Sequence, residues 1–357
     1  MIIYVIGTIL SMWFAYLATH NKNSMDNNKI NTKILCVLSA LPLTLISAFR
    51  YNVGADYIPY KVYFENLLVG HINDYFEVGF YHFAKIIQIF TTNYAFFFII
   101  MAILFSYFIF KSIYEESPNP VLSIFLLVSM QYYFISMNGM RQLIAIAIFM
   151  YSIKYIKKKK IIPFILLNII GTLLHNAIIL LFPLYFLYGK KINTKIQIIV
   201  LSMGLLLGNV LRNFFTSLII NTKYYSYIGS SYDVSNNGTI TLLIEVTILV
   251  LGHIYSKKVI SEEEDKKYQF FLNLQFFSTF FAAINYVFPL LYRIRWCFGL
   301  SSIIFLPLVL NRILEVDKKQ YILILFMIYL LFSIYILYVV GVGNSNLVLP
   351  YTTIFNK

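Results

Sequence analysis

Long apolar runs separated by short polar segments make up most of the chain. Ten of these runs approach the roughly 17–25 residues that an α-helix needs to cross about 30 Å of hydrocarbon. They are Ile2–Ala18, Ile34–Phe49, Tyr94–Phe110, Val121–Met137, Gln142–Ile156, Ile196–Leu211, Ile240–Tyr255, Phe270–Pro289, Trp296–Leu310 and Tyr321–Val340. The pattern predicts an all-α fold, a polytopic bundle of membrane-spanning helices.

One further apolar stretch, residues 161–188, is too long for one upright helix and short for two full ones. Lysines flank it on both sides, at Lys157–Lys160 and at Lys190 and Lys191. Because lysine-rich loops stay on the cytoplasmic side, we predict a hairpin that crosses twice, with His175 near its outer turn. The bundle then has about 11–12 spans and both termini outside. A single tilted helix is the alternative, and it would place the later lysines outside.

The composition supports this class of protein. The chain of 357 residues is 60% hydrophobic and 12% charged, with a mean hydropathy of +0.75. Soluble domains are about half apolar and roughly a quarter charged, so a soluble globule, a disordered chain and a soluble nucleic-acid-binding protein are excluded. We expect one transmembrane domain over residues 1–357, with surface segments on the outer face at 50–93 and 212–239. The acidic run Glu262–Asp265 is expected to be a solvated inner loop.

The two kinds of basic residue fall on different faces of the predicted bundle. The net charge is +13, and most lysines lie in predicted inner loops, where they orient the chain. Of the six arginines, only Arg312 is predicted inside. The guanidinium is a planar fork suited to phosphate or carboxylate groups, whereas lysine is a point charge. Arginines on the outer face oppose the usual bias, which indicates a function for them.

Two short motifs contain outer arginines. The first runs from Arg50 to Tyr60, and Gly54 permits a tight turn that can bring Arg50 and Asp56 together. In the second, Asn138–Gln142, the loop is so short that Arg141 lies near the interface or inside the bundle. Ionisable residues at such depth are costly and mark substrate sites. The alternative for both motifs is structural, with each arginine at a helix end beside lipid headgroups.

Two later features are candidates of the same kind. His175 is the one histidine inside a long apolar run, and a neutral imidazole can act as a general base or as an interhelical hydrogen bonder. In Tyr292–Trp296, Arg293 and Arg295 flank one isoleucine. We expect one arginine to point into the site and the other to reach the headgroups. One topology places all four features at the same outer face.

Several well-known catalytic motifs are absent from the sequence. It contains no HExxH, P-loop, GxSxG or DxD-type pair. This disfavours a zinc protease, a nucleotide-driven pump and a metal-dependent glycosyltransferase. We therefore expect neither a metal nor a cofactor.

Taken in order, the motifs resemble those of the EpsG family, Wzy-like polymerases of bacterial exopolysaccharides and capsules. The family pattern R-x-x-x-G-x-D-Y-x-x-Y is matched by Arg50, Gly54, Asp56, Tyr57 and Tyr60. The later elements are matched by Glu77 with Gly79 and Phe80, by Asn138, Arg141 and Gln142, by Lys157–Lys160, by His175 and by Arg293. One departure is Cys297-Phe298, where Tyr-Phe is usual. The resemblance covers most of Arg50–Phe298.

The resemblance implies a GT-C-like membrane transferase at the outer face of the bacterial cytoplasmic membrane. Its donor would be a growing glycan on undecaprenyl pyrophosphate, and its acceptor one repeat unit on the same lipid. A chain-length regulator and a flippase are the protein partners that it implies, beside membrane lipid and without nucleic acid. An alternative outside the family is a flippase for lipid-linked units. Another is a glycan ligase, which would differ only in its acceptor.

The implied reaction assigns roles to the outer residues. Pyrophosphate is a good leaving group, so the site mainly needs fixed positive charge. Our hypothesis is that Arg141 and Arg293 bind it, aided by Gln142 and by Arg50 or Arg295. The base is His175 or Asp56, with His175 preferred for its pKa range. Tyr57 and Tyr60 could stack on sugars, or anchor the protein at the interface.

Overall fold

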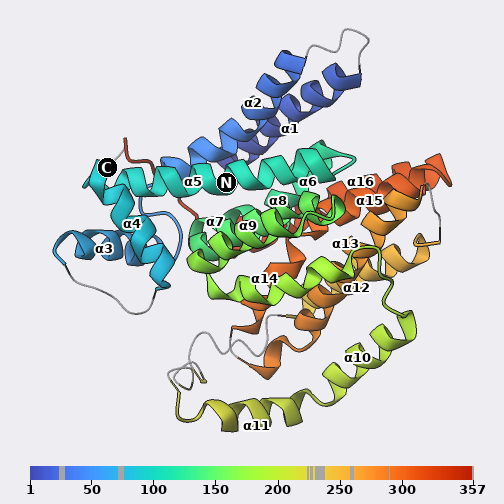
Figure 1. Ribbon diagram of the computed structural model, residues 1–357. Helices are drawn as coiled ribbons and strands as arrows, with labels where there is room; N and C mark the ends of the chain where they lie inside the picture. The colour runs from blue at the N-terminus through green and yellow to red at the C-terminus, as the bar shows by residue number, and fades with distance from the viewer. Residues whose placement is uncertain are drawn as a thin grey trace. The chain divides into compact units, whose positions relative to one another are not determined.

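The computed structural model is built from helices, as the apolar runs predict, and has no strand in the part it describes (Figure 1). That part comprises residues 1–23, 29–70, 76–222, 225, 228–229, 238–257, 261–288 and 290–355. Each predicted run falls on one helix or on two consecutive helices. Pro289, the end of one run, and most of the predicted outer segment 212–239 beyond residue 222 lie outside the described residues. The all-α expectation is confirmed.

The helices identify a multi-pass membrane protein. Four helices are long and apolar enough to cross a membrane, at Ile2–Asn21, Ile30–Ala48, Tyr94–Glu116 and Lys318–Val342. Three bent helix pairs raise the number to seven within the described residues. This is fewer than the 11–12 expected. Four shorter apolar helices of 10–17 residues fall below the length of a full span. In addition, the helix at 140–157 carries three basic residues, so it is not among the candidate spans.

The chain divides into two compact units. Unit 1 comprises Met1–Phe182 and Lys319–Lys357, and unit 2 comprises Pro183–Lys318. The helices of unit 1 are α1 (Ile2–Asn23), α2 (Lys29–Ala48), α3 (Tyr57–Leu68), α4 (Val78–Phe90), α5 (Tyr94–Glu116), α6 (Pro120–Ser129), α7 (Tyr132–Asn138), α8 (Met140–Lys157), α9 (Ile161–Leu174), most of α16 (Lys318–Ile336) and the π-helical turn η4 (Leu337–Val342). The 3₁₀ helix η1 (Asn176–Leu187) begins in unit 1 and continues into unit 2.

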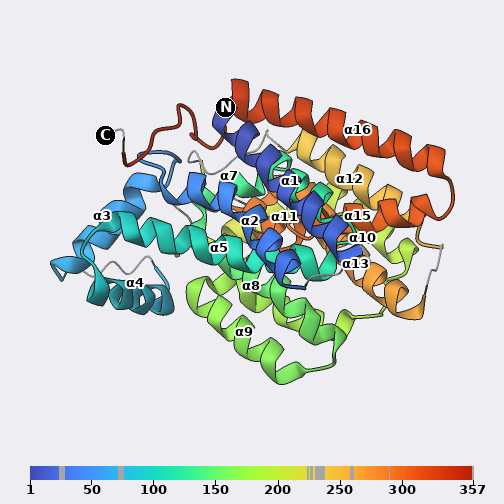
Figure 2. The ribbon, with the colours of Figure 1, turned by 90° about the horizontal axis from the view of Figure 1, so that it is seen from above.

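Helix α8 forms the core of unit 1. Of its 18 residues, 13 are buried, 11 of them apolar, and the unbroken buried run 142–150 covers every face of the helix, as expected for a helix enclosed by others. It packs against α5, α7 and α9, while α2 joins α5 to α1. Helices α3 and α4 pack against each other, and α3 also contacts α5 (Figure 2). Helix α4 in turn contacts α9.

Residues 161–188 form a helical hairpin, as expected, but each of its two helices is shorter than a full membrane span. Helix α9 ends at Leu174, and His175 has an extended backbone, with φ −157° and ψ 118°, before η1 begins. The ring of Phe164 lies 6.4 Å from that of Phe182, so residues near opposite ends of the stretch face each other. In η1 the buried residues recur every third position, at Ile178 and Leu181, which matches the period of a 3₁₀ helix. The turn at His175 is therefore confirmed.

In unit 2, α13 is the central helix. Unit 2 contains α10 (Thr194–Leu206), α11 (Gly208–Ile219), α12 (Thr239–Ile254), α13 (Glu262–Ala283), η3 (Asn285–Val287), α14 (Leu291–Gly299) and α15 (Ser302–Leu314). Helix α13 packs against α10, α12, α14 and α15. It contains buried Gln269, Asn273 and Gln275, which lower its hydropathy below that of the candidate spans.

Residues Glu262–Asp265 are mostly exposed, as expected, but the expectation that they form a loop was wrong. These residues form the first turn of α13, where Ser261 caps the helix by accepting a hydrogen bond from the backbone N–H of Glu264 at 3.2 Å. Acidic side chains are favourable at a helix N-terminus. Asp265 also pairs with Arg312 at 2.8 Å. The acidic run therefore starts and anchors a helix.

Candidate active site

Arg141 lies at the start of α8, directly after the break at Gly139. Its Nη1 donates to Oε2 of Glu77, and its Nε donates to the hydroxyl of Tyr60 at 3.4 Å. The guanidinium also lies 4.1 Å from the ring centre of Phe76. The Nη2 group has no hydrogen-bond partner among the described residues, and the side chain is 14% exposed. One side of the guanidinium therefore remains available to an anion.

Glu77 joins Arg141 to the predicted histidine. Its Oε1 lies 2.8 Å from Nδ1 of His175 and accepts a hydrogen bond from the backbone N–H of Asn176 at 3.3 Å. The carboxylate is 11% exposed, so it is mostly but not fully sealed. We call these three side chains the Arg141–Glu77–His175 cluster. They come from α8, from the N-cap of α4 and from the turn after α9.

Gly79 permits this arrangement. A β-carbon at this position would lie 2.4 Å from Cβ of Leu173 and 2.5 Å from its carbonyl oxygen. Only a residue without a side chain therefore lets the start of α4 approach the end of α9 so closely. That approach places Glu77 within reach of His175. The spacing Glu-x-Gly in the sequence thus has a geometric reason.

Arg50 has a different environment from Arg141. It is 1% exposed and donates to the carbonyl oxygens of Ser47 and Met137, at 2.9 and 2.8 Å. It forms no ion pair with Asp56 in the described part of the chain, so the turn at Gly54 does not join these two residues. Burial lowers the pKa of Arg50 to about 10, which still leaves it charged at neutral pH. This geometry favours a structural role.

The first two arginine motifs pack against each other. Gly54 has φ +101°, and a β-carbon there would lie 2.6 Å from Oδ1 of Asn138. The same oxygen faces the backbone N–H of Asp56 at 3.4 Å. Asp56 itself precedes α3, is half-buried and has no ion pair among the described residues. The two motifs therefore form one structure, with Asp56 beside it as a second candidate base.

The other predicted residues of unit 1 are buried. The ring of Tyr57 stacks on Phe98 at 4.4 Å, and that of Tyr60 stacks on Phe76 at 5.8 Å. Both tyrosines are at most 5% exposed, so neither ring presents a face to a sugar in this structure. Gln142 is buried in α8. Of these three, only Tyr60 touches the cluster, through its hydroxyl.

The C-terminal segment, residues 344–354, lies across the same region. The backbone N–H of Gly54 donates to the carbonyl of Leu347 at 2.8 Å, and Nδ2 of Asn138 donates to the carbonyl of Asn346 at 3.1 Å. Arg50 and Thr353 form an antiparallel bridge. This segment therefore fastens both arginine motifs, a role that their sequence patterns did not indicate.

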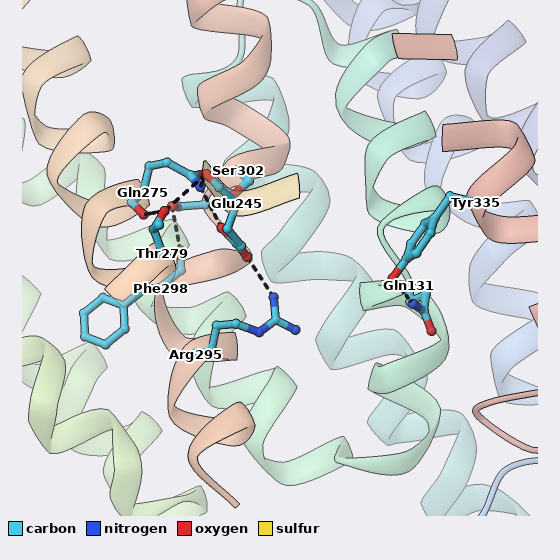
Figure 3. A network of polar contacts seen from close by, with 9 residues as sticks. Gln131, Glu245, Gln275, Thr279, Arg295, Phe298, Ser302 and Tyr335 are labelled. Atoms are coloured by element: carbon cyan, nitrogen blue, oxygen red, sulfur yellow. Dashed lines mark hydrogen bonds and ion pairs between the residues drawn. The ribbon is translucent and has the colours of Figure 1, made fainter. Parts of the chain in front are cut away.

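In unit 2, Arg295 belongs to a network of polar side chains (Figure 3). Nη1 of Arg295 donates to Oε1 of Glu245 at 2.8 Å, and Nε2 of Gln275 donates to Oε2 at 2.6 Å. Ser302 in turn donates to Oε1 of Gln275 at 2.7 Å. Glu245 is 1% exposed, so this carboxylate is sealed. The guanidinium carbon of Arg293 lies 6.0 Å from the ring centre of Tyr292.

Two acidic residues of these sites received no role from the sequence. Glu77 was matched to the family pattern without a function, and its role needs the contact with His175. Glu245 is the only acidic residue in the apolar run 240–255, a feature that by itself indicates a buried partner. Among the described residues, no group of three or more His, Cys, Asp or Glu side chains could hold a metal ion.

The comparison with protein families settles the class of the protein. The family model for the EpsG family matches residues 33–353. The chain belongs to the EpsG family. This is a family of Wzy-like polysaccharide polymerases, which indicates a polysaccharide polymerase or a related glycosyltransferase. No curated protein and no solved structure matches the chain. The match extends beyond Arg50–Phe298 at both ends and reaches Thr353 in the C-terminal segment.

Proposed function

We propose that the protein joins undecaprenyl-pyrophosphate-linked oligosaccharide repeat units into capsular or exopolysaccharide at the outer face of the bacterial cytoplasmic membrane. Family membership supports a polymerase, and the Arg141–Glu77–His175 cluster supports an active site at these three residues. The cluster is the observation that carries the proposal. It places a cation with an open side and an imidazole on one carboxylate, at the meeting point of three helices.

The donor half of the reaction requires fixed positive charge. As the bond between the anomeric carbon and the pyrophosphate oxygen breaks, the leaving group takes the electron pair and its charge grows. Arg141 is proposed to stabilise that charge through Nη2, the group that no described residue engages. Arg293 is proposed to supplement it, whereas Arg295, which pairs with buried Glu245, is assigned a structural role. Arg50, which is buried among neutral acceptors, is assigned a structural role.

The acceptor half requires a base. The acceptor hydroxyl oxygen forms the new bond to the anomeric carbon, and its proton passes to the base. His175 is the proposed base because it stands in the same cluster as Arg141, through Glu77. Asp56 is the second candidate, since its carboxylate is half-buried beside the motif of Asn138. Direct displacement of this kind would invert the anomeric centre.

Purified protein in liposomes tests the proposal. The substrate is an undecaprenyl-pyrophosphate-linked repeat unit, with no nucleotide added, and products are separated on a gel. Wild type should yield a glycan ladder, Arg141→Ala should yield none, and Arg212→Ala should resemble wild type. Arg212 is a suitable control because it donates to the carbonyl of Tyr286 at 2.7 Å, in unit 2.

The other outcomes separate the alternatives. Movement of the lipid-linked unit between leaflets without a ladder would contradict polymerisation and indicate a flippase. Transfer of one glycan to a different acceptor, without chain growth, would indicate a ligase. A ladder of equal length and rate from Arg141→Ala would leave the polymerase but remove Arg141 from its site.

A further inference from the structure

Glu77 holds two different side chains through its two carboxylate oxygens. Oε2 accepts from Nη1 of Arg141, and Oε1 faces Nδ1 of His175 at 2.8 Å. The backbone N–H of Asn176 also donates to Oε1 at 3.3 Å, so the carboxylate is held from a third direction. With both oxygens engaged and only 11% of the side chain exposed, Glu77 is placed to orient its neighbours.

The chemistry of these contacts fixes the state of the imidazole. An ionised carboxylate only accepts hydrogen bonds, so Nδ1 of His175 must carry the hydrogen in this contact. In a neutral imidazole the other nitrogen, Nε2, then carries the lone pair. Arg141 donates to the second oxygen of Glu77, and such a charge-assisted contact suits an ionised carboxylate. The same logic applies where a carboxylate orients a ligating or catalytic histidine.

We propose that Glu77 is a positioning residue that holds neutral His175 as the Nδ1–H tautomer, so that Nε2 is its basic atom, while it anchors Arg141 in the same site. The inference rests on the proposed function in that it takes His175 as the base. It adds a residue to which the sequence assigned no role. It also states which nitrogen of His175 receives the acceptor proton.

The fold holds this geometry rigidly. Gly79 brings the start of α4 against Leu173, so Glu77 cannot withdraw without moving the helix. His175 sits at the hairpin turn between α9 and η1, where its backbone N–H donates to the carbonyl of Gly171 at 2.9 Å. Glu77 is also the N-cap residue of α4, and a helix N-terminus favours a negative charge.

The tautomer can be measured without an activity assay. The full-length protein is prepared in detergent with ¹⁵N-labelled histidine, and the ring nitrogens are correlated with the ring protons at a pH where the ring is neutral. The chain has five histidines, and loss of one signal in His175→Gln assigns His175. Wild type should show hydrogen on Nδ1. Hydrogen on Nε2 of His175 in wild type would overturn the proposal.

The isosteric variant Glu77→Gln should reverse the tautomer. Arg141 has no acceptor, so the amide oxygen must face it, and the amide NH₂ then faces Nδ1. Nδ1 becomes an acceptor, and the hydrogen moves to Nε2. An unchanged spectrum in Glu77→Gln would contradict the inference. Because this readout is independent of glycosyl transfer, it stands even if the proposed polymerisation fails.

Kinetics separate positioning from packing. Glu77→Gln should lower kcat by up to about 10⁴-fold, the loss that the wrong histidine tautomer causes in a serine-protease triad. Glu77→Asp keeps the charge and the tautomer but shortens the reach, and should retain more activity than Glu77→Gln. If Glu77 only filled space, the isosteric glutamine would be the better substitute. Equal or greater activity in Glu77→Gln than in Glu77→Asp would therefore overturn the proposal.

Discussion

Each compact unit contains an arginine–glutamate ion pair, and the two pairs differ in what else the carboxylate contacts. In unit 2, Glu245 is 1% exposed and receives hydrogen bonds from Arg295 and Gln275. In unit 1, Glu77 is 11% exposed and shares its charge between Arg141 and a titratable imidazole. The difference lies in the carboxylates, because the two arginines are about equally exposed, at 15% for Arg295 and 14% for Arg141. Glu245 is sealed from ligand and solvent, whereas Glu77 is partly open.

The comparison separates two uses of the same chemistry. A sealed ion pair contributes little net stability, but removal of one partner leaves an uncompensated buried charge. An ion pair near an opening can exchange one partner for a substrate anion, because water and ligand can reach it. We therefore expect the Arg295–Glu245 pair to govern stability and the Arg141–Glu77–His175 cluster to govern rate.

The largest expected effect is on stability, at the sealed pair. Arg295→Met should destabilise the protein by about 3–5 kcal/mol, because Glu245 loses its counter-charge in a buried position. Thermal unfolding in detergent measures this as a lower Tm. The double variant Arg295→Met with Glu245→Gln should recover most of the loss, since the buried charge is then gone. Unchanged Tm in the single variant would show that this pair is not structural.

At the open pair the expected effect falls on the rate. Arg141→Ala should lower the polymerisation rate by about 10²–10³-fold, the cost of removing one group that stabilises a developing anion. Its Tm should fall much less than that of Arg295→Met, because Glu77 keeps its contacts to His175 and Asn176. Arg141→Lys should be intermediate, since it keeps the charge without the planar fork. A similar drop in Tm for Arg141→Ala and Arg295→Met would erase the distinction between the two pairs.

Much of the fold could be predicted because apolar runs of helical length carry the signal themselves. The bends between consecutive helices could not be predicted. The run Val121–Met137 is continuous in sequence, yet α6 and α7 meet at 54°. Gln131 at the break has φ +69° and donates from Nε2 to the hydroxyl of Tyr335 at 2.7 Å. No glycine or proline marks this position, and its partner lies 204 residues away. A contact so distant in sequence leaves no local pattern.

The candidate site shows the same division. Arg141 and His175 could be selected singly, because each is an ionisable residue in an apolar setting. Their connection through Glu77 depends on how α4 approaches α9, which no spacing in the chain reveals. Other signals were present in the sequence but not used. Ser261 followed by Glu264 has the pattern of a capping box, which predicts the helix start where we expected a loop.

A smaller effect is expected at Gly79, where the start of α4 closely approaches the end of α9 and so positions Glu77. Gly79→Ala should lower the polymerisation rate by about 10²-fold, because a β-carbon 2.4 Å from that of Leu173 displaces α4 and moves Glu77 from His175. Gly341→Ala is the matched control, since nothing lies within 4 Å of a β-carbon there. The rates are compared in the liposome assay. Full activity in Gly79→Ala would mean that the close approach of α4 to α9 is not needed for the cluster.

The smallest expected effect concerns the contacts that fasten the two arginine motifs. Asn138→Ala removes the oxygen that faces the N–H of Asp56 and the amide that donates to Asn346. Net hydrogen bonds contribute about 1 kcal/mol each, so the loss of stability should be about 1–2 kcal/mol. The rate should fall less than in Gly79→Ala, because Asn138 touches neither Glu77 nor His175 in the described structure. A loss of activity as large as that of Arg141→Ala, at unchanged Tm, would move the centre of the site toward Asp56. Asp56 would then replace His175 as the leading candidate for the base.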